Sequence, residues 1–67
     1  MTKFEIRAHV PGEHENRLVE TLNQEWFAYA VYYCILENNP GELPAETLVE
    51  LRHVDDNGSM TLVSETL

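Results

Sequence analysis

Residues 26–36 read WFAYAVYYCIL, eleven consecutive positions without a charge, a glycine or a proline in a chain of 67 residues. A helix that crosses a membrane needs about 20 apolar residues, so this run is too short to span a bilayer. The first ten residues also lack the apolar segment of a signal peptide. We therefore expect a cytoplasmic protein in which this run is either core or a surface made for another molecule.

A chain of this length forms one small domain, here residues 1–67, and buries only a modest share of its surface. Small domains usually gain stability from disulfides, a metal or a second subunit. The single cysteine, Cys34, cannot form an intramolecular disulfide and fits a reducing compartment. Because the Cys and His spacing matches no zinc site, we expect neither a metal nor another cofactor. Association with a second copy or with another protein is the remaining source of stability.

Residues 3–10 alternate strictly between apolar and polar side chains, which predicts a strand with one buried and one solvated face. The apolar positions are Phe4, Ile6, Ala8 and Val10, and the polar ones are Lys3, Glu5, Arg7 and His9. Pro11 and Gly12 end the strand.

Residues 13–39 contain neither glycine nor proline and predict one long amphipathic helix. At about 100° per residue, one continuous stripe collects Leu18, Val19, Leu22, Trp26, Tyr29, Ala30, Tyr33 and Leu36. We expect this stripe to cover the sheet. Glu13 suits the positive end of the helix and can pair with Arg17 one turn later. Residues 38–41, NNPG, are a typical helix stop.

A second arrangement of this stretch is also open. Residues 26–36 are rich in aromatic and β-branched side chains, which suits a buried strand. That arrangement needs a short helix at 13–24 and a turn near residues 23–25, where no glycine or proline occurs. The long helix is therefore the preferred prediction.

Residues 47–54 and 59–66 are two β-prone runs on either side of Asp55-Asp56-Asn57-Gly58. An Asn-Gly pair between such runs predicts a hairpin with a type I′ turn. The expected order of elements is β-α-β-β. We predict a two-layer α+β fold in which one long helix packs on a three-stranded antiparallel sheet.

In the predicted helix, Phe27, Val31 and Ile35 form an apolar row on the side away from the sheet. Exposure of such side chains forgoes about 1.5–3 kcal/mol each relative to full burial, so a cover is expected. Three covers remain open: the 37–46 loop with Leu43, a second copy of the chain, or a different protein. Tyr32 is a further candidate contact because tyrosine joins a large apolar ring to a polar tip.

No residue pattern in this chain indicates catalysis. His9 and His53 would need further ligands to bind a metal, and Cys34 lies in an apolar run that predicts an inert core thiol. Residues 55–58 lack the twelve-residue spacing of a calcium loop. Neither a phosphate-binding loop nor a dinucleotide motif occurs, so we do not expect an enzyme.

Twelve acidic residues against four basic ones give a net charge of −8. Phosphate contacts need Lys and Arg, so direct binding of nucleic acid or of an anionic membrane is disfavoured. The charge either only solubilises the chain or attracts a protein with a basic surface. On the second interpretation, the candidate partner-binding residues are Phe27, Val31, Ile35, Tyr32, Glu13, Glu20, Glu50, Asp55 and Asp56.

In size, net charge, lack of catalytic motifs and an apolar face without an internal cover, the chain resembles small acidic phage-encoded anti-defence proteins, the anti-CRISPR and DNA-mimic inhibitors. The resemblance extends over the whole chain and rests on no motif, so it assigns no residue a role. It implies inhibition by binding, in which an acidic surface occupies the Lys- and Arg-lined groove of a nucleic-acid-handling protein. The alternative is a small structural or accessory module that homodimerises through its apolar helix face.

Overall fold

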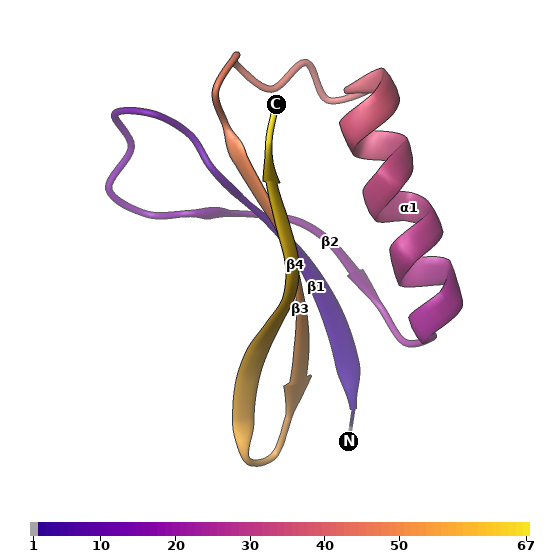
Figure 1. Cartoon of the computed structure of the whole chain (residues 1–67). Coiled ribbons are helices and arrows are strands. Elements are labelled where there is room, and N and C mark those ends of the chain that lie inside the picture. Colours follow the sequence, from indigo (N-terminus) through magenta and orange to yellow (C-terminus); the bar gives the residue numbers. More distant parts are fainter. Residues whose placement is uncertain (1) are drawn as a thin grey trace.

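The structure, a computed structural model, describes residues 2–67 as four strands and one helix in two layers (Figure 1). The elements are β1 Lys3–His9, β2 Arg17–Leu22, α1 Glu25–Asn38, β3 Leu48–Asp55 and β4 Gly58–Thr66. The strands form one antiparallel sheet in the order β2-β1-β3-β4, and α1 packs on one face of it, over β1, β2 and β3. The predicted α+β class is confirmed. The predicted three strands and β-α-β-β order are wrong, because a fourth strand precedes the helix.

Strand β2 occupies residues where the sequence predicted the first half of a long helix. Pro11 and Gly12 lie in the connection that turns the chain back, so that β2 pairs with β1. Since β3 lies along the other edge of β1, the first strand has a neighbour on both sides. A helix over residues 13–39 would have left the backbone polar groups along one edge of β1 without that partner. The alternative prediction, a helix at 13–24 followed by a strand at 26–36, is wrong as well because it has the two elements in reverse order.

Helix α1 begins after Gln24, whose backbone is extended, and ends at Asn38. Asn39 then adopts the left-handed conformation with φ 43°, and its N–H donates to the carbonyl of Ile35 at 2.8 Å. Pro40 follows and cannot continue the helix. The predicted helix stop at residues 38–41 is therefore confirmed. Within residues 2–67, no helix combines the length and apolar character needed to cross a membrane.

The predicted sheet-facing stripe is correct only in part: its Tyr29 and Leu36 pack against the core cluster, but the side of α1 that is fully buried differs from the predicted one. The helix buries Ala28, Tyr32 and Ile35, which recur at helical spacing, whereas Trp26 from the predicted sheet-facing stripe is 70% exposed. The prediction was wrong because residues 18–22 set the phase of that stripe, and those residues belong to β2.

The core lies between α1 and the sheet. Its buried cluster consists of Phe4, Ile6, Leu22, Ala28, Tyr32, Ile35, Val49 and Leu51. The buried half of the predicted alternation along residues 3–10 is confirmed, since all four apolar positions are buried, but Glu5 on the predicted solvated face is buried as well. Leu43, from the connection between α1 and β3, packs against the edge of this cluster.

Strands β3 and β4 form the predicted hairpin, with residues paired from Leu48 opposite Thr66 to Asp55 opposite Gly58. Among residues 55–58, only Gly58 has a positive φ, at 131°. A type I′ turn needs positive φ at both central residues, so the predicted turn type is wrong. The side chain of Asp55 supports the turn, because its Oδ1 accepts the N–H of Asn57 at 2.8 Å.

Candidate protein-binding surface

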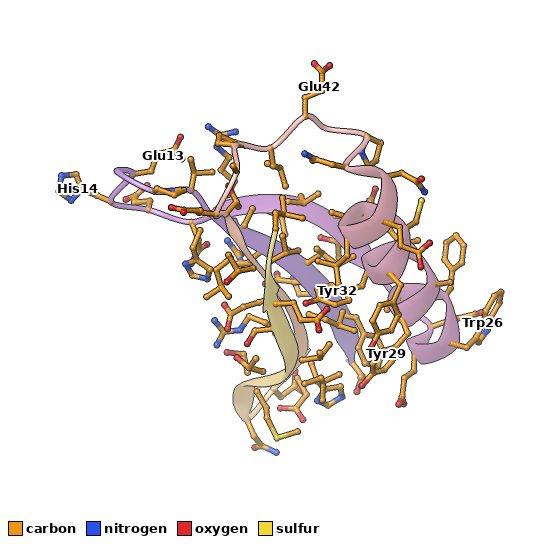
Figure 2. All side chains as sticks on the ribbon, turned by 45° about the horizontal axis from the view of Figure 1, so that its top comes forward. Glu13, His14, Trp26, Tyr29, Tyr32 and Glu42 are labelled. Carbon is orange, nitrogen blue, oxygen red and sulfur yellow. The ribbon has the colours of Figure 1, made fainter. Side chains whose placement is uncertain are left out.

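Three aromatic rings project from the side of α1 that faces away from the sheet. Trp26 is 70% exposed, Phe27 48% and Tyr33 45%, and Figure 2 shows Trp26 pointing outward from the helix. Ala30 and Cys34 are also exposed and lie between these rings at helical spacing. We call these five residues the aromatic face. Contiguous apolar surface of this kind on a small protein commonly marks an interaction site.

Neighbouring groups hold the exposed rings in place. The ring centroids of Trp26 and Phe27 lie 5.4 Å apart in a tilted arrangement, and the Trp26 indole Nε1 donates to Oε1 of Gln24 at 2.8 Å. The ring of Tyr33 meets the edge of buried Tyr32 at a centroid distance of 5.4 Å. Side chains that are already ordered lose less conformational entropy when a partner binds.

Only negative charges accompany the aromatic face on α1. The helix has Glu25 in its first turn and Glu37 near its end, and it contains no Lys or Arg. Glu20 on β2 and Glu65 on β4 are both exposed and pair in register with buried residues of neighbouring strands, so they point to the same side of the sheet as α1. By the same rule Arg17 on β2, which pairs with buried Ala8, points to this side, where it binds Glu13. The helix side of the molecule therefore combines aromatic rings with carboxylates and a single arginine.

The other side of the sheet has the opposite charge. We call this side the open face, and its charged and titratable side chains are Lys3, Glu5, Arg7, His9, Glu50 and Arg52. It holds three of the four Lys and Arg residues of the chain but only two of the twelve carboxylates. In the formal count at pH 7, which treats histidine as neutral, three cations and two carboxylates give the open face a net charge of +1. Since the whole chain has a net charge of −8, the residues outside the open face have a net charge of −9.

On the open face the carboxylates lie beneath the cations. Glu5 accepts a hydrogen bond from Nε of Arg7 at 3.0 Å and pairs with Nζ of Lys3 at 3.3 Å, and its side chain is only 11% exposed. Glu50 lies 2.6 Å from Nε2 of His9 and is 13% exposed. The cationic groups are therefore the outermost charges of this face, with Lys3 47% exposed.

The carboxylate of Glu50 has a lowered pKa. Burial alone raises the pKa of Glu50, but hydrogen bonds from His9 and Thr61 and the charges of His9 and Arg52 lower it below its ordinary value of 4.5. A carboxylate held in this way joins β1 to β3 and is ionised at neutral pH. Glu50, a predicted partner contact, is thus engaged inside the protein.

The predicted apolar contacts are mostly buried. Phe27 is exposed, but Val31 is half-buried, Ile35 is 6% exposed and Tyr32 has no exposed surface. The prediction that Phe27, Val31 and Ile35 form an uncovered row is therefore wrong: the sheet covers Ile35 and part of Val31. Cys34, predicted to be a core thiol, is exposed.

Sequence reasoning missed Trp26 and Tyr33 as surface residues. The predicted helix begins at residue 13, and its sheet-facing stripe includes both residues. Residues 25–38 alone do not reveal the buried side, because apolar residues lie on every side of this helix; only the structure shows that Ala28, Tyr32 and Ile35 form it.

The predicted acidic contacts do not form one patch. Glu13 lies in the connection between β1 and β2 and binds Arg17, with Nε of the arginine 3.0 Å from Oε1, so the predicted pair exists outside any helix. The other four are spread over three elements: Glu20 is exposed on β2, Glu50 is on the open face, and Asp55 and Asp56 are at the β3–β4 turn. The acidic character of the chain is therefore distributed around the aromatic face and the loops.

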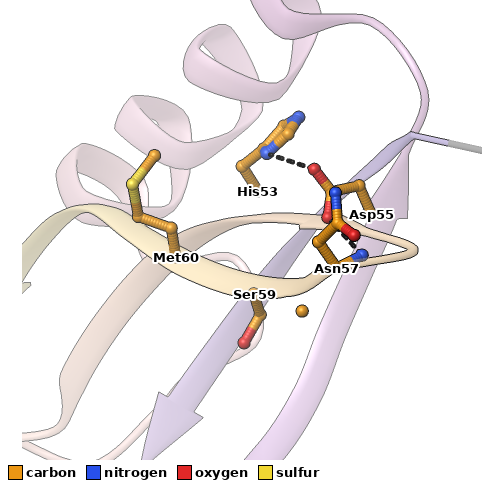
Figure 3. A pocket seen from close by; sticks show the side chains of 6 residues that line it. His53, Asp55, Asn57, Ser59 and Met60 are labelled. Carbon is orange, nitrogen blue, oxygen red and sulfur yellow. Dashed lines mark hydrogen bonds and ion pairs between the residues drawn. The ribbon is translucent and has the colours of Figure 1, made fainter.

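One shallow hollow of about 220 Å³ lies at the β3–β4 turn and is lined by His53, Asp55, Asn57, Gly58, Ser59 and Met60 (Figure 3). His53 Nδ1 is 4.0 Å from Oδ2 of Asp55, and the hydroxyl of Ser59 is already bound by Nη2 of Arg52 at 2.7 Å. His53 points to the helix side and His9 to the open face, so the two histidines do not share a site. In the described part of the chain, no three His, Cys, Asp or Glu side chains are grouped to hold a metal.

Comparison with protein-family models, with curated protein sequences and with solved structures finds no match for this chain. The candidate site therefore rests on the geometry of the molecule. The aromatic face gathers three of the six exposed large hydrophobic side chains of residues 2–67 on one helix, on the side of the sheet away from the open face.

Proposed function

We propose that this chain is a non-enzymatic binding protein whose aromatic face docks on a basic protein surface. The observation that supports this most is the separation of charge. The rings of Trp26, Phe27 and Tyr33 lie on a helix whose charged side chains are all carboxylates, whereas three of the four Lys and Arg residues lie on the open face. A partner with Lys and Arg around an apolar recess complements both features.

The rings and the carboxylates have different parts in this binding. Trp and Tyr are enriched among the residues that dominate interface energies, and full burial of such a side chain contributes about 1.5–3 kcal/mol. A partner Lys or Arg placed over the exposed indole of Trp26 adds about 0.5–1 kcal/mol through a cation–π contact. The surrounding carboxylates chiefly speed association with a basic surface.

The proposed target is a nucleic-acid-handling protein or complex with a Lys- and Arg-lined groove. The charge of −9 outside the open face attracts such a groove, and the bound chain then occludes the nucleic acid stoichiometrically. This is the mode of action of the anti-CRISPR and DNA-mimic inhibitors that the chain resembles. The proposal includes a cytoplasmic location, which suits the free and exposed thiol of Cys34.

A homodimer through α1 is the second candidate, because the aromatic face could be buried against its own copy. Glu37 lies on the same side of α1 as Trp26 and Tyr33, and a pair of helices joined through that side would offer it no cation, because α1 contains no Lys or Arg. The net charge of −8 on each copy adds repulsion between them. A basic partner removes the repulsion and is therefore the preferred occupant.

The experiment that tests the proposal is a pull-down with the tagged chain from a lysate of its native host, at low and moderate salt, read by mass spectrometry. We expect enrichment of a nucleic-acid-binding complex that decreases with salt and with added DNA or RNA, since both compete for basic groups. Recovery of the chain alone would contradict a hetero-partner and favour a self-associating module.

Variants connect the captured complex to the aromatic face. Trp26→Ala combined with Tyr33→Ala removes two rings, and Leu18→Ala is the matched control because Leu18 is 51% exposed on a different element. We expect the double variant to lose the complex and the control to retain it. Equal retention by both would contradict docking through the aromatic face. Glu25→Lys with Glu37→Lys tests the electrostatic part separately.

A further inference from the structure

We infer that the outer edge of β4 pairs with β4 of a second copy of this chain in an antiparallel arrangement. β4 is the last strand in the sheet order, so among residues 2–67 no strand pairs with its outer edge. It is nine residues long and contains no Lys, Arg or Pro and only one charged residue, Glu65. Charged side chains and prolines are the usual means by which proteins block edge pairing, and β4 lacks nearly all of them.

The opposite edge of the sheet is built differently. β2 has six residues, and two of them, Arg17 and Glu20, are charged. Its register with β1 shifts between the partners of Ile6 and Arg7, and α1 packs against this strand. Both edge strands have a register shift, so length and charge distinguish them: the short, charged β2 is better protected against addition than the long and nearly uncharged β4.

A β-bulge in β4 restricts the registers in which the strand can pair with itself. Leu51 lies opposite Val63 and Arg52 lies opposite Thr61, so Leu62 is the extra residue. Both Leu62 and Val63 pack against the core cluster, which places two consecutive side chains on the helix side. Alternation therefore changes phase at this point of the strand.

Residues that face each other in an antiparallel ladder point to the same side of the sheet. A two-fold axis between residues 62 and 63 satisfies this rule along β4. It places the bulge of one copy opposite the bulge of the other, so the alternation of side chains changes at the same point in both strands. A shift by one residue would set open-face side chains against helix-side ones. The resulting pairs are Leu62 with Val63, Thr61 with Ser64, Met60 with Glu65, and Ser59 with Thr66.

In this register no like charges meet. Glu65 of each copy lies opposite Met60 of the other, which covers part of a side chain that is 59% exposed in the single chain. Leu62 and Val63 of the two copies form an apolar centre on the axis, and such cross-strand pairs stabilise sheets. A net charge of −8 opposes association of two copies in general. β4, however, has a single charged residue, so electrostatic repulsion is small at this edge and a second copy is the occupant that fits.

The two-fold axis of an antiparallel pair is perpendicular to the sheet. Both α1 helices would therefore lie on the same side of one continuous sheet, and both aromatic faces would point the same way. Two sites presented together bind a large target more tightly than one, through effective concentration. This consequence rests on the proposed function, whereas the pairing itself does not.

The experiment is analytical ultracentrifugation of the full chain from micromolar to millimolar concentration, where we expect a reversible monomer–dimer equilibrium. Thr61→Lys with Ser64→Lys places like charges opposite each other on both sides of the axis, and we expect at least about a tenfold loss of association. The matched control, Thr61→Lys with Ser64→Glu, has the same first substitution but places opposite charges there and should associate at least as well as the unsubstituted chain. The first variant lowers the magnitude of the net charge from −8 to −6, so general repulsion cannot explain its loss.

Three results would overturn the inference: a monomer at every concentration, equal association of the two variants, or a dimer that is lost with Trp26→Ala. Thermal unfolding of each variant establishes that it is folded. None of these readouts involves a target, so they stay informative if the proposed function fails.

Disulfide trapping tests the register independently. In a Cys34→Ser background, a chain with Thr61→Cys mixed with a chain with Ser64→Cys should form a disulfide dimer, because residues directly opposite each other have Cα atoms about 4.5–5.5 Å apart, a separation that a disulfide spans. Neither chain alone should form it efficiently, since equal positions are then offset along the strands. Efficient trapping within either single population would contradict the register.

Discussion

The hydroxyl of Tyr32 donates a hydrogen bond of 2.7 Å to the backbone carbonyl of Val49. Neither residue has any exposed surface. Because Tyr32 comes from α1 and Val49 from β3, the bond joins the two layers from within the core, and Figure 2 shows the tyrosine between the helix and the sheet. It holds α1 in the rotation that turns the aromatic face outward.

Removal of this hydroxyl tests the junction between the layers. Tyr32→Phe should lower the free energy of unfolding by about 1 kcal/mol, because a buried hydrogen bond is lost with little change in volume. Tyr33→Phe, on a ring that is 45% exposed, is the control and should be nearly neutral. Chemical denaturation measures both. Equal effects of the two changes would mean that the buried bond contributes nothing particular.

The same hydroxyl should limit stability at alkaline pH. Burial, followed by the nearby charges of Glu65 and Tyr33, raises the pKa of Tyr32 to about 12 from an ordinary value of 10.0. A group whose pKa is raised on folding stabilises the fold fully below its unfolded pKa and loses that contribution as pH rises through the folded value. We therefore expect stability to fall between pH 10 and about 12, and to fall less in Tyr32→Phe. Parallel pH curves for the two proteins would refute this assignment.

Glu50 should set part of the acid dependence. Its pKa lies below 4.5 in the folded chain, so its contribution is complete above pH 4.5 and is lost as pH falls through the folded value. Glu50→Gln should be less stable than the unsubstituted chain at pH 7, and the difference should shrink below pH 4.5. Glu37→Gln, on the exposed surface of α1, is the control. A constant difference at all pH values would place the effect in packing instead of ionisation.

Asn39 should stabilise the end of α1 in two separable ways. It is left-handed, its side-chain oxygen accepts the N–H of Leu43 at 2.8 Å, and its amide donates to the Leu43 carbonyl at 2.9 Å. Asn39→Ala should cost about 1–2 kcal/mol, since it loses both bonds and places an alanine at positive φ. Asn39→Gly should cost less, because only the bonds are lost. Asn38→Ala, one residue earlier and exposed, is the control for thermal unfolding.

Trp26 is the only tryptophan, so its fluorescence reports directly on the aromatic face. With 70% of the residue exposed, we expect a red-shifted emission and quenching by acrylamide nearly as strong as in the denatured chain. This exposure should persist when the chain dimerises through β4 and should disappear when α1 is covered. If acrylamide quenching of Trp26 decreases as the protein concentration rises, the chain dimerises through α1 and not through the edge of β4.

Much of the architecture could be predicted where a local pattern leaves one solution. The alternation of Phe4, Ile6 and Ala8 selects one face of a strand, and the same three residues are buried in the structure. The Asn-Pro-Gly sequence ended the helix where the prediction had it, although no single residue there predicts the contacts of Asn39 with Leu43. The β3–β4 hairpin was predicted for the same reason, but its turn type depends on backbone angles that Asn-Gly alone does not determine.

The candidate site was predicted less well, because it depends on helix rotation. Phe27 was predicted to be on the surface and is, but Tyr32 and Ile35 exchanged places with Trp26 and Tyr33. When the predicted start of the helix moves, different residues define its apolar stripe. Residues 26–36 are apolar on every side of the helix, so their sequence does not show which side is buried.

By itself, the sequence determined the α+β class, the buried side of the first strand, the end of the helix and the acidic charge of the chain. Only the tertiary structure decided that residues 17–22 are a strand and which side of α1 meets the sheet. The segment RLVETL is short and compatible with either helical or extended structure, and its choice follows from hydrogen bonding along β1, a partner that lies across a turn in the chain. Once β2 and β3 flank β1, the sheet offers one apolar face, and Tyr32 and Ile35 turn toward it, where the Tyr32 hydroxyl finds the carbonyl of Val49 as its hydrogen-bond partner.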